Sequence, residues 1–447
     1  MAPKAAPAQA VVKPPAKAAV KSPKKAKQTE EPPKPAKRTQ TTFSEWKDLT
    51  PSKSSFEVDD VDVAVLNSIR RTILSDIPNV AFRYDAFDKD ESSITFHTNT
   101  GALHNEFLGH RLSLIPLCFT EKQLDAVLSG QARYRFVLKK HNTTKSDIVD
   151  VLTSDFVVYL DDRPLDVHER EAILPPDGFT GDYILITRLK PGEAVHAECV
   201  PAEGTAKEHA AWCPVSLCVF HNRTDPQAAA VAFAQRLEAM RESRSADGKP
   251  QLTEEEEAEY ERRFYILDAQ RCFQRNKYGE PRCFTFCIET ECRLRPAYLV
   301  AKALRLLIER VKRLEYVFGK DDDAFKRDTS AAVAPLDEEA GSYDVCIDDE
   351  GHTLGNLLQS LLFELYHRES GELTYVGYYQ RHPLENSVSL RLTPTKPMDV
   401  AEFRAFMSQA CAKVAGHLLQ IAEDWTTFSG VEIEATSAET WTAFVRS

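Results

Sequence analysis

Residues 351–365, with the sequence GHTLGNLLQSLLFEL, constrain the fold more than any other stretch of this chain. The leucines in this stretch recur at steps of three and four residues, which places them on one wide face of a helix. They are Leu354, Leu357, Leu358, Leu361, Leu362 and Leu365. Thr353 is a reasonable N-cap, because its hydroxyl can accept a hydrogen bond from the first turn. Such an apolar face predicts burial against a second apolar helix.

A similar helix is predicted far upstream, over residues 61–77, with Asp59 or Asp60 as its cap and Pro78 closing it. Arg70 and Arg71 lie off its apolar stripe. Two longer amphipathic helices are predicted, one opened by Pro296 and one over residues 399–425. We expect the four helices to pack together. The central residues of that interface are expected to be Val65, Ile69, Ile73, Leu307, Val311, Leu354, Leu358, Leu361, Met407 and Val414.

The order of these segments predicts that one unit occurs twice in the chain. Each copy has a strand, a helix of about four turns, further strands and a long amphipathic C-terminal helix. Neither copy covers both of its helix stripes alone, whereas face-to-face packing covers all four. Residues 319–342 show no helical periodicity and are predicted to be a linker, which keeps the second unit at high effective concentration.

The charge is unevenly distributed along the chain. The net charge is -12, but residues 1–40 carry about +8, so the remainder is near -20. This Ala-, Pro- and Lys-rich tail, residues 1–42, buries too little apolar area to fold and is predicted to be disordered. Its KSPKKAK segment, Lys21 to Lys27, fits a nuclear address, a phosphate-binding arm or a solubilising tail.

The rest of the composition is that of an ordinary globular chain of roughly two to four domains. No apolar run has the length of a membrane span and no signal peptide is apparent, while the ten scattered cysteines indicate a reducing compartment. Short alternating runs over residues 130–200 predict half-buried strands. Residues 221–263 predict a helical surface insertion, in which Thr253 and Glu256 form a capping box.

Several motifs resemble one protein family. NSIRRTILSDIPNVAF (Asn67 to Phe82), LHNEFLGHRLSLIPL (Leu103 to Leu117) and GTAKEHAAWCPV (Gly204 to Val215) resemble the third-largest subunit of eukaryotic and archaeal RNA polymerase. DDEGHTLGNLL (Asp348 to Leu358) and GYYQRHPLENSVSLRLTPT (Gly377 to Thr395) resemble its small partner, the eleventh subunit. The fusion of both in one chain resembles the arrangement in large nucleocytoplasmic DNA viruses.

The resemblance implies an α+β fold: two α-subunit-like dimerisation modules packed through a four-helix interface, the first interrupted by a mostly β insert domain. The expected divisions are a tail 1–42, first-module parts 43–88 and 223–318, an insert domain 89–222, an acidic helical insertion 225–262, a linker 319–342 and a second module 343–447. The resemblance also implies that the chain is a non-catalytic scaffold that docks the two largest polymerase subunits and small assembly subunits. No sequence-specific nucleic-acid contact, membrane contact or homo-oligomer is expected.

Residues expected to contact those partners are carried over by motif position. They are Asn67, Arg70, Arg71, His110, Arg111, His352, Thr353 and Asn356. Helix capping or local hydrogen bonding remains an alternative role for each of them. The expected location is intracellular, with the nucleus, a cytoplasmic virus factory and the virion left open. An alternative function is a transcription regulator that binds nucleic acid through the basic tail.

Metal and catalytic chemistry are not expected. Family members often carry a zinc-binding cysteine cluster in the insert domain, but residues 119–198 contain no cysteine. The spacings of Cys272, Cys283, Cys287 and Cys292 do not match a paired zinc knuckle, so buried thiols are the default. No P-loop, dinucleotide fingerprint, zincin motif or nucleophile elbow occurs. We therefore predict no cofactor, no metal and no catalytic residue.

Overall fold

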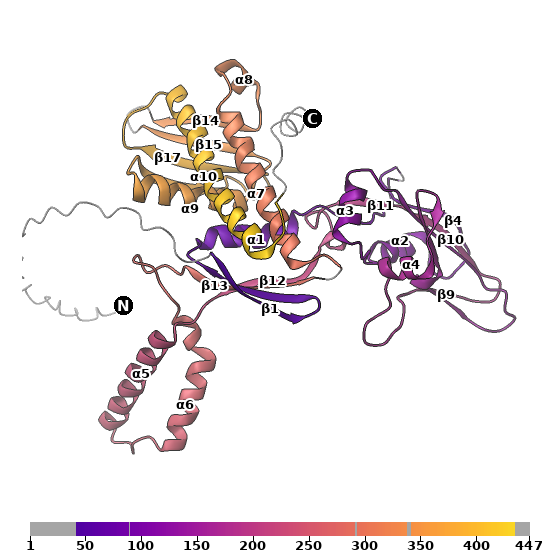
Figure 1. Cartoon of the computed structure of the whole chain (residues 1–447), viewed down its shortest axis with the longest axis horizontal. Helices are drawn as coiled ribbons and strands as arrows, with labels where there is room; N and C mark the ends of the chain where they lie inside the picture. Colours follow the sequence, from indigo (N-terminus) through magenta and orange to yellow (C-terminus); the bar gives the residue numbers. More distant parts are fainter. Residues whose placement is uncertain (1–41, 89, 291–292, 338–340, 434–447) are drawn as a thin grey trace, which may run out of the picture. The chain divides into compact units, whose positions relative to one another are not determined.

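The computed structural model describes residues 42–88, 90–290, 293–337 and 341–433 (Figure 1). Apart from Thr42, the basic tail that we predicted to be disordered lies outside the described residues. None of the described helices is long and apolar enough to cross a membrane.

The first module is a four-stranded antiparallel sheet with two helices. Its strands are β1 (Phe43–Thr50), β2 (Lys53–Asp59), β12 (Val215–Asn222) and β13 (Cys283–Thr290), and its helices are α1 (Val63–Ser75) and α7 (Pro296–Phe318). The strand order is β1-β2-β13-β12. Alternate residues of β13 are buried, as expected for a strand with one face on the core.

The second module has the same topology. Its elements are β14 (Ala331–Asp337), β15 (Ser342–Asp348), α9 (His352–Leu362), a π-helical turn (Phe363–Glu369), β16 (Leu373–Tyr379), β17 (Ser387–Pro394) and α10 (Val400–Ser429). The strand order is β14-β15-β17-β16. Each sheet element and each helix of the first module therefore has a counterpart here in the same chain order.

The segment expected to be a linker is folded, so that prediction was wrong for most of its length. Residues 319–342 contain α8 (Asp322–Arg327) and β14, which pairs with β15. Asp321, within the predicted linker, caps α8 by accepting a hydrogen bond from the Ala324 amide at 2.8 Å. Strand β14 was not predictable from the sequence, because it is rich in alanine and is stabilised mainly by pairing with a neighbouring strand. It is the counterpart of β1.

The insert domain is mostly β. A five-stranded sheet has the order β4-β10-β5-β7-β8, and β6 with β9 and β3 with β11 form two-stranded sheets. The bounds are β3 (Asn79–Phe82), β4 (Ile94–Asn99), α2 (Asn105–Ser113), α3 (Glu121–Leu128), β5 (Tyr134–His141), β6 (Val149–Leu152), β7 (Phe156–Leu160), β8 (Arg163–Pro164), α4 (Val167–Ile173), β9 (Leu185–Leu189), β10 (Ala194–Cys199) and β11 (Pro201–Gly204). Strand β12, which we placed in this domain, instead pairs with β13 of the first module.

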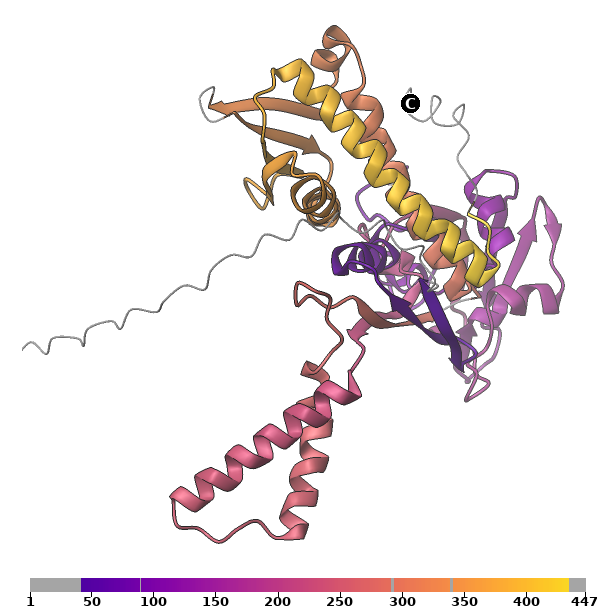
Figure 2. The same cartoon turned by 60° about the vertical axis from the view of Figure 1, so that its left-hand side comes forward.

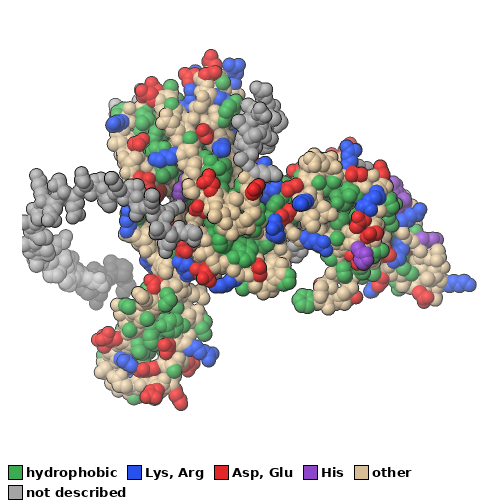
Figure 3. Space-filling view, in the orientation of Figure 1, with side chains coloured by type: hydrophobic (Ala, Val, Ile, Leu, Met, Phe, Trp, Pro, Cys, Tyr) green, Lys and Arg blue, Asp and Glu red, His purple; other side chains and the backbone are tan. Residues whose placement is uncertain are grey.

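Residues between β12 and β13 form a helical hairpin. Helices α5 (Pro226–Ala246) and α6 (Glu254–Leu267) enclose a small core of their own around Phe264. Thr253 and Glu256 form the capping box that the sequence predicted. Hydrophobic side chains also show on the outside of this hairpin (Figure 3), where Val231, Ile266 and Leu267 are more than half exposed.

The starts of the two shorter helices differ from the sequence prediction. Asp62, not Asp59 or Asp60, caps α1 and accepts a hydrogen bond from the Ala64 amide at 2.7 Å. Gly351 is the N-cap of α9, so Thr353 lies inside the first turn. Its hydroxyl is thereby left to contact another helix instead of its own backbone.

The four helices form one interface between the modules, which confirms the predicted fold class. Helix α7 lies along α10 in both views (Figures 1 and 2), and α1 contacts both α9 and α7. Helix α9 also contacts α10. The buried side chains of both modules belong to one continuous hydrophobic cluster.

Candidate functional site at the junction of the two modules

The junction has an apolar centre. Each of the ten residues expected there is at most 4% exposed: Val65, Ile69, Ile73, Leu307, Val311, Leu354, Leu358, Leu361, Met407 and Val414. Fully burying one such side chain stabilises the fold by roughly 1.5–3 kcal/mol. The pairing of the two modules thus removes these apolar helix faces from water.

Polar pairs close both ends of the α1–α9 contact. The Arg71 guanidinium donates from Nε to the Thr353 hydroxyl at 2.8 Å, near the start of α9. The Ser360 hydroxyl, late in α9, donates to the Asp62 carboxylate at 2.9 Å, at the start of α1. The start of each helix therefore meets the later part of the other. This reciprocity is what an approximate two-fold axis between like modules produces.

The α7–α10 pair carries its own polar contacts and an aromatic cluster around Trp425. The Trp425 indole donates to the Ala297 carbonyl at 3.1 Å, and the Ser408 hydroxyl donates to the Glu315 carbonyl at 3.0 Å. Phe43 and Phe56 of the first module lie against the Trp425 ring, each with its ring centroid 4.9 Å away. Strands of one module thus pack directly on the C-terminal helix of the other.

An arginine on α7 joins the end of α1 to the loop that leads into α9. Arg310 bonds the Asp76 carboxylate at 2.6 Å, and its Nε lies 3.8 Å from the Glu350 carboxylate. Burial raises the pKa of Glu350, which the positive charge of Arg310 opposes. The carboxyls of two modules therefore share one cation at this point.

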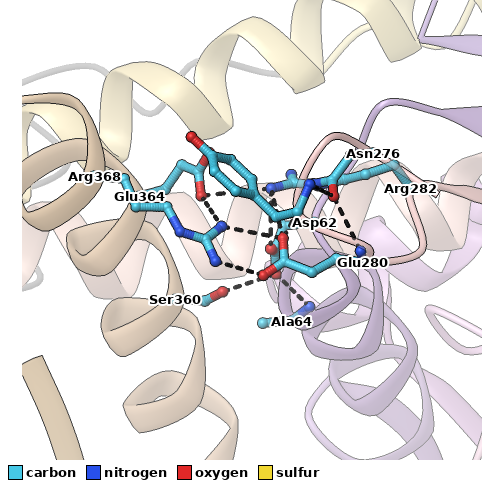
Figure 4. A network of polar contacts seen from close by, with 9 residues as sticks. Asp62, Ala64, Asn276, Glu280, Arg282, Ser360, Glu364 and Arg368 are labelled. Carbon is cyan, nitrogen blue, oxygen red and sulfur yellow. Dashed lines mark hydrogen bonds and ion pairs between the residues drawn. The ribbon is translucent and has the colours of Figure 1, made fainter. Parts of the chain in front are cut away.

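A second charged network lies at the opposite end of α1 (Figure 4). Arg282, which follows the helical hairpin and is only 15% exposed at its side chain, has its Nη2 3.7 Å from Asp62 and 3.6 Å from Glu364. The Asp62 carboxylate thus caps its own helix, accepts from Ser360 and faces Arg282. A loop of the first module, the start of α1 and the π-helical turn of the second module therefore meet at this network.

The residues expected to bind partners divide between the junction and the insert domain. Arg71 and Thr353 contact each other, so both serve the junction. The Arg70 Nε donates to the Asn67 amide oxygen at 3.0 Å on the same face of α1. His352 is exposed, with its ring beside Tyr378, and Asn356 is half-buried. Their contact with a partner protein stays a prediction.

The other two candidates lie on α2, which contacts β3, β4 and β9. Arg111 donates to the backbone carbonyls of Leu185 and Ile186 at 2.7 and 2.9 Å. His110 lies edge-on to the Tyr84 ring. Hydrogen bonding of this kind orders the insert domain, which is the local role that the sequence left open for them.

The cysteine cluster does not form a metal site within the part of the chain that the structure describes. No three His, Cys, Asp or Glu side chains there are arranged to hold an ion. Cys283 and Cys287 lie on the same face of β13 and are half-buried, and burial raises the pKa of both thiols. Cys292 lies outside the described residues.

Sequence reasoning missed the charged residues of the junction. Glu280, Arg282, Glu364 and Arg368 sit in stretches whose charges resemble a solvated surface. The only local signal was Glu364 and Arg368 spaced one helical turn apart, which is common on exposed helices. Their partners lie far away in the sequence, so tertiary structure alone brings them together.

Two modules of one topology, paired through their helices within a single chain, define a tandem dimerisation protein. Residues 55–311 match the RNA polymerase Rpb3/Rpb11 dimerisation domain, and residues 342–423 match a second family of the same description. The first match covers more than half of the chain, which therefore belongs to the Rpb3/Rpb11 dimerisation-domain family.

Curated relatives agree with this assignment. The chain is 28% identical over 183 residues to DNA-directed RNA polymerase subunit Rpo3 of Methanobrevibacter smithii, covering 39% of this chain and 57% of the relative. It is 24% identical over 196 residues to subunit 3 of DNA-directed RNA polymerases II, IV and V of Arabidopsis thaliana, covering 40% and 56%. RPB3 of Schizosaccharomyces pombe is 24% identical over 183 residues. These matches span little more than half of each relative's length.

Proposed function

We propose that this chain is a non-catalytic assembly subunit of a multisubunit DNA-directed RNA polymerase. The observation that carries the proposal is the paired arrangement of two Rpb3/Rpb11-type dimerisation domains in one chain. A scaffold needs a rigid body with outward surfaces, and the shared hydrophobic core supplies that rigidity. We further propose that the chain is a fusion of the third-largest and eleventh subunits, as in large nucleocytoplasmic DNA viruses. It would act inside the cell, in the nucleus or in a cytoplasmic virus factory.

The surface that docks the two largest subunits is proposed to lie on the outer side of α1 and at the start of α9. Asn67 and Arg70 lie on α1 away from its fully buried stripe, and His352 is exposed at the first residue of α9. Arginine suits such a surface because its planar guanidinium pairs with carboxylates in a fixed geometry. Small assembly subunits are proposed to bind elsewhere on the same body.

Co-purification tests this proposal. Tagged full-length protein, expressed with the polymerase, should recover the two largest subunits. Arg70→Glu should lower that recovery several-fold while the unfolding midpoint stays close to wild type, because Arg70 contacts only Asn67 among the described side-chain hydrogen bonds. Arg71 is unsuitable for this purpose, since its loss also removes the bond to Thr353.

Arg188→Glu provides the matched control. Arg188 is an exposed arginine of the insert domain that pairs with Asp150 at 2.9 Å. Its reversal alters net charge equally but should leave recovery unchanged. Full recovery of the largest subunits by Arg70→Glu would remove this residue from the docking surface, and failure of the wild-type protein to recover them would refute the scaffold role.

A further inference from the structure

Arg368 of the second module contacts Tyr278 and Glu280 of the first module across the junction. Its guanidinium donates to both oxygens of Glu280, at 2.6 and 3.1 Å, and to Glu364 at 2.9 Å. The Tyr278 ring lies under the same guanidinium, with 4.2 Å between its centroid and Cζ. We call these four residues the guanidinium clamp: Tyr278, Glu280, Glu364 and Arg368. Figure 4 labels Glu280, Glu364 and Arg368. Bidentate bonding to a carboxylate is a strong mode of arginine recognition, and stacking on an aromatic ring adds to it.

The first-module half of the clamp is held in shape by hydrogen bonds within its own loop. The Asn276 side chain accepts hydrogen bonds from the amides of Tyr278 and Glu280, at 2.9 and 3.0 Å. Gly279 has a φ of 84°, in the left-handed region that glycine adopts freely. Glu280 is therefore presented by a closed turn, which reduces the entropy lost on pairing.

The same loop is anchored to the first-module sheet. Arg223 donates to the Gln274 amide oxygen at 3.2 Å and also bonds Glu57 and Asp59 of β2. An isolated bridge pairs Thr224 with Phe273 at the base of the helical hairpin. These hydrogen bonds and this bridge fix the position of Glu280 relative to α1 and its N-cap.

The second-module half depends on the π-helical turn after α9. A π-helical turn is rare, and its larger number of residues per turn changes the direction in which the following side chains project. Arg368 lies near the end of this turn, with its guanidinium 4.8 Å from the centroid of the Phe363 ring. The guanidinium is thus held between Phe363 of its own module and Tyr278 of the other.

The apolar helix faces cannot by themselves decide which module pairs with which. Both buried faces consist mostly of aliphatic side chains, and the α1–α9 contact is nearly reciprocal. In a pair of two first modules, Arg71 of one copy would take the place of Ser360 and meet Asp62 of the other. That contact is favourable, so hydrophobic burial and helix ends would both permit like pairing.

The clamp has no counterpart in a like pair. Arg71 corresponds to Ser360, so counting along the chain pairs Ser75, the last residue of α1, with Glu364, and Asn79, the first residue of β3, with Arg368. Neither can take the role of a guanidinium. We propose that the guanidinium clamp is the specificity determinant that makes the first module pair with the second module and not with a second copy of itself.

Two differently tagged full-length copies, expressed together, test the proposal. Capture through one tag reports how many chains are bound to a second copy, and cleavage between Lys320 and Asp321 before capture, with the tag on the first module of each copy, restricts the signal to pairs of first modules. Arg368→Glu places an acid against Glu280 and should raise co-capture of the second tag several-fold over wild type. Glu280→Arg combined with Arg368→Glu restores an opposite pair across the junction and should return co-capture to the wild-type level.

Arg241→Glu is the matched control. Arg241 bonds Glu257 at 2.6 Å within the helical hairpin, a pair of similar geometry that does not cross the junction. It should not change co-capture. If Arg368→Glu proves insoluble, Glu280→Gln removes one charge of the same pair and should also raise co-capture. Unchanged co-capture by the folded single variant, or no recovery in the double variant, would overturn the proposal.

Unfolding of the same variants supplies an independent measurement. A double-mutant cycle over Glu280 and Arg368 should show coupling of about five- to tenfold in the unfolding equilibrium constant. The polymerase role is not involved in either measurement, so the scaffold proposal and the clamp proposal can fail separately. Coupling indistinguishable from zero would show that the two side chains do not act together.

Discussion

Glu280 and Glu350 are both glutamates at the module junction, yet their surroundings shift their pKa values in opposite directions. The hydrogen bonds from Arg368 hold the pKa of Glu280 at about 2, well below its ordinary value. Burial raises the pKa of Glu350, and Arg310 offsets this only in part. The contribution of an ion pair to the free energy of module pairing thus depends on how far its charges are buried, as well as on the number of ion pairs formed.

The Glu280 shift predicts a particular acid dependence. A depressed carboxyl pKa stabilises the folded state above the unfolded value, and this contribution is lost as pH falls from about 4.5 towards 2. At pH 7 we expect Glu280→Gln to lower the free energy of unfolding by about 1 kcal/mol, because 39% of the Glu280 side chain is exposed and solvent screens the pair.

Urea unfolding of wild type and Glu280→Gln at several pH values measures this. The difference in unfolding free energy should be constant from pH 7 to about 5. It should shrink below about 4.5, where Glu280 takes up a proton in the unfolded chain while it stays ionised in the folded protein. A difference that stayed constant down to pH 3 would contradict the assignment of the depressed pKa to this residue.

At the scale of the elements, glycines on two helices experience opposite environments. A Cβ at Gly355 of α9 would approach the Val388 side chain to 2.6 Å and Tyr378 to 2.8 Å, so this helix lies very close to its sheet. A Cβ at Gly416 of α10 would meet no atom within 4 Å. The first glycine is required by packing, whereas the second only weakens its helix.

Alanine at these two positions should therefore act with opposite signs. Gly355→Ala should destabilise the protein by about 1–3 kcal/mol through overpacking, and Gly416→Ala should stabilise it by up to about 1 kcal/mol through helix propensity. Unfolding midpoints of the two variants, compared with wild type, measure both. If both variants shifted the unfolding midpoint by the same amount in the same direction, the close approach of α9 to its sheet would not limit side-chain size at Gly355.

The four long or apolar helices were predictable from the sequence because each has one buried stripe. Helices α1, α7, α9 and α10 follow from their periodicity, and so does their packing together. Strand β14 did not follow, because its order comes from pairing with β15. The guanidinium clamp could not be predicted either: Glu280 and Arg368 are far apart in sequence, and each alone resembles an exposed charge.

For the whole molecule, two modules of one topology are covalently joined yet meet through buried helix faces and polar contacts. The connection is itself structured: Arg404 of α10 bonds Asp322 of α8 at 2.6 Å, and Lys320 bonds Asp328 at 2.6 Å. A covalent link raises the effective concentration of the second module. Burial of the four helices, however, supplies the free energy that holds the modules together.

Cleavage of the folded chain tests most directly whether helix burial, without the covalent link, holds the two modules together. A protease site inserted between Lys320 and Asp321 separates the first module from a second module that keeps α8 and β14. After cleavage and dilution to about 1 μM, size-exclusion chromatography should recover both fragments in one peak at the position of the uncut chain. Fragments that elute separately at that concentration would contradict the conclusion that helix burial holds the two modules together.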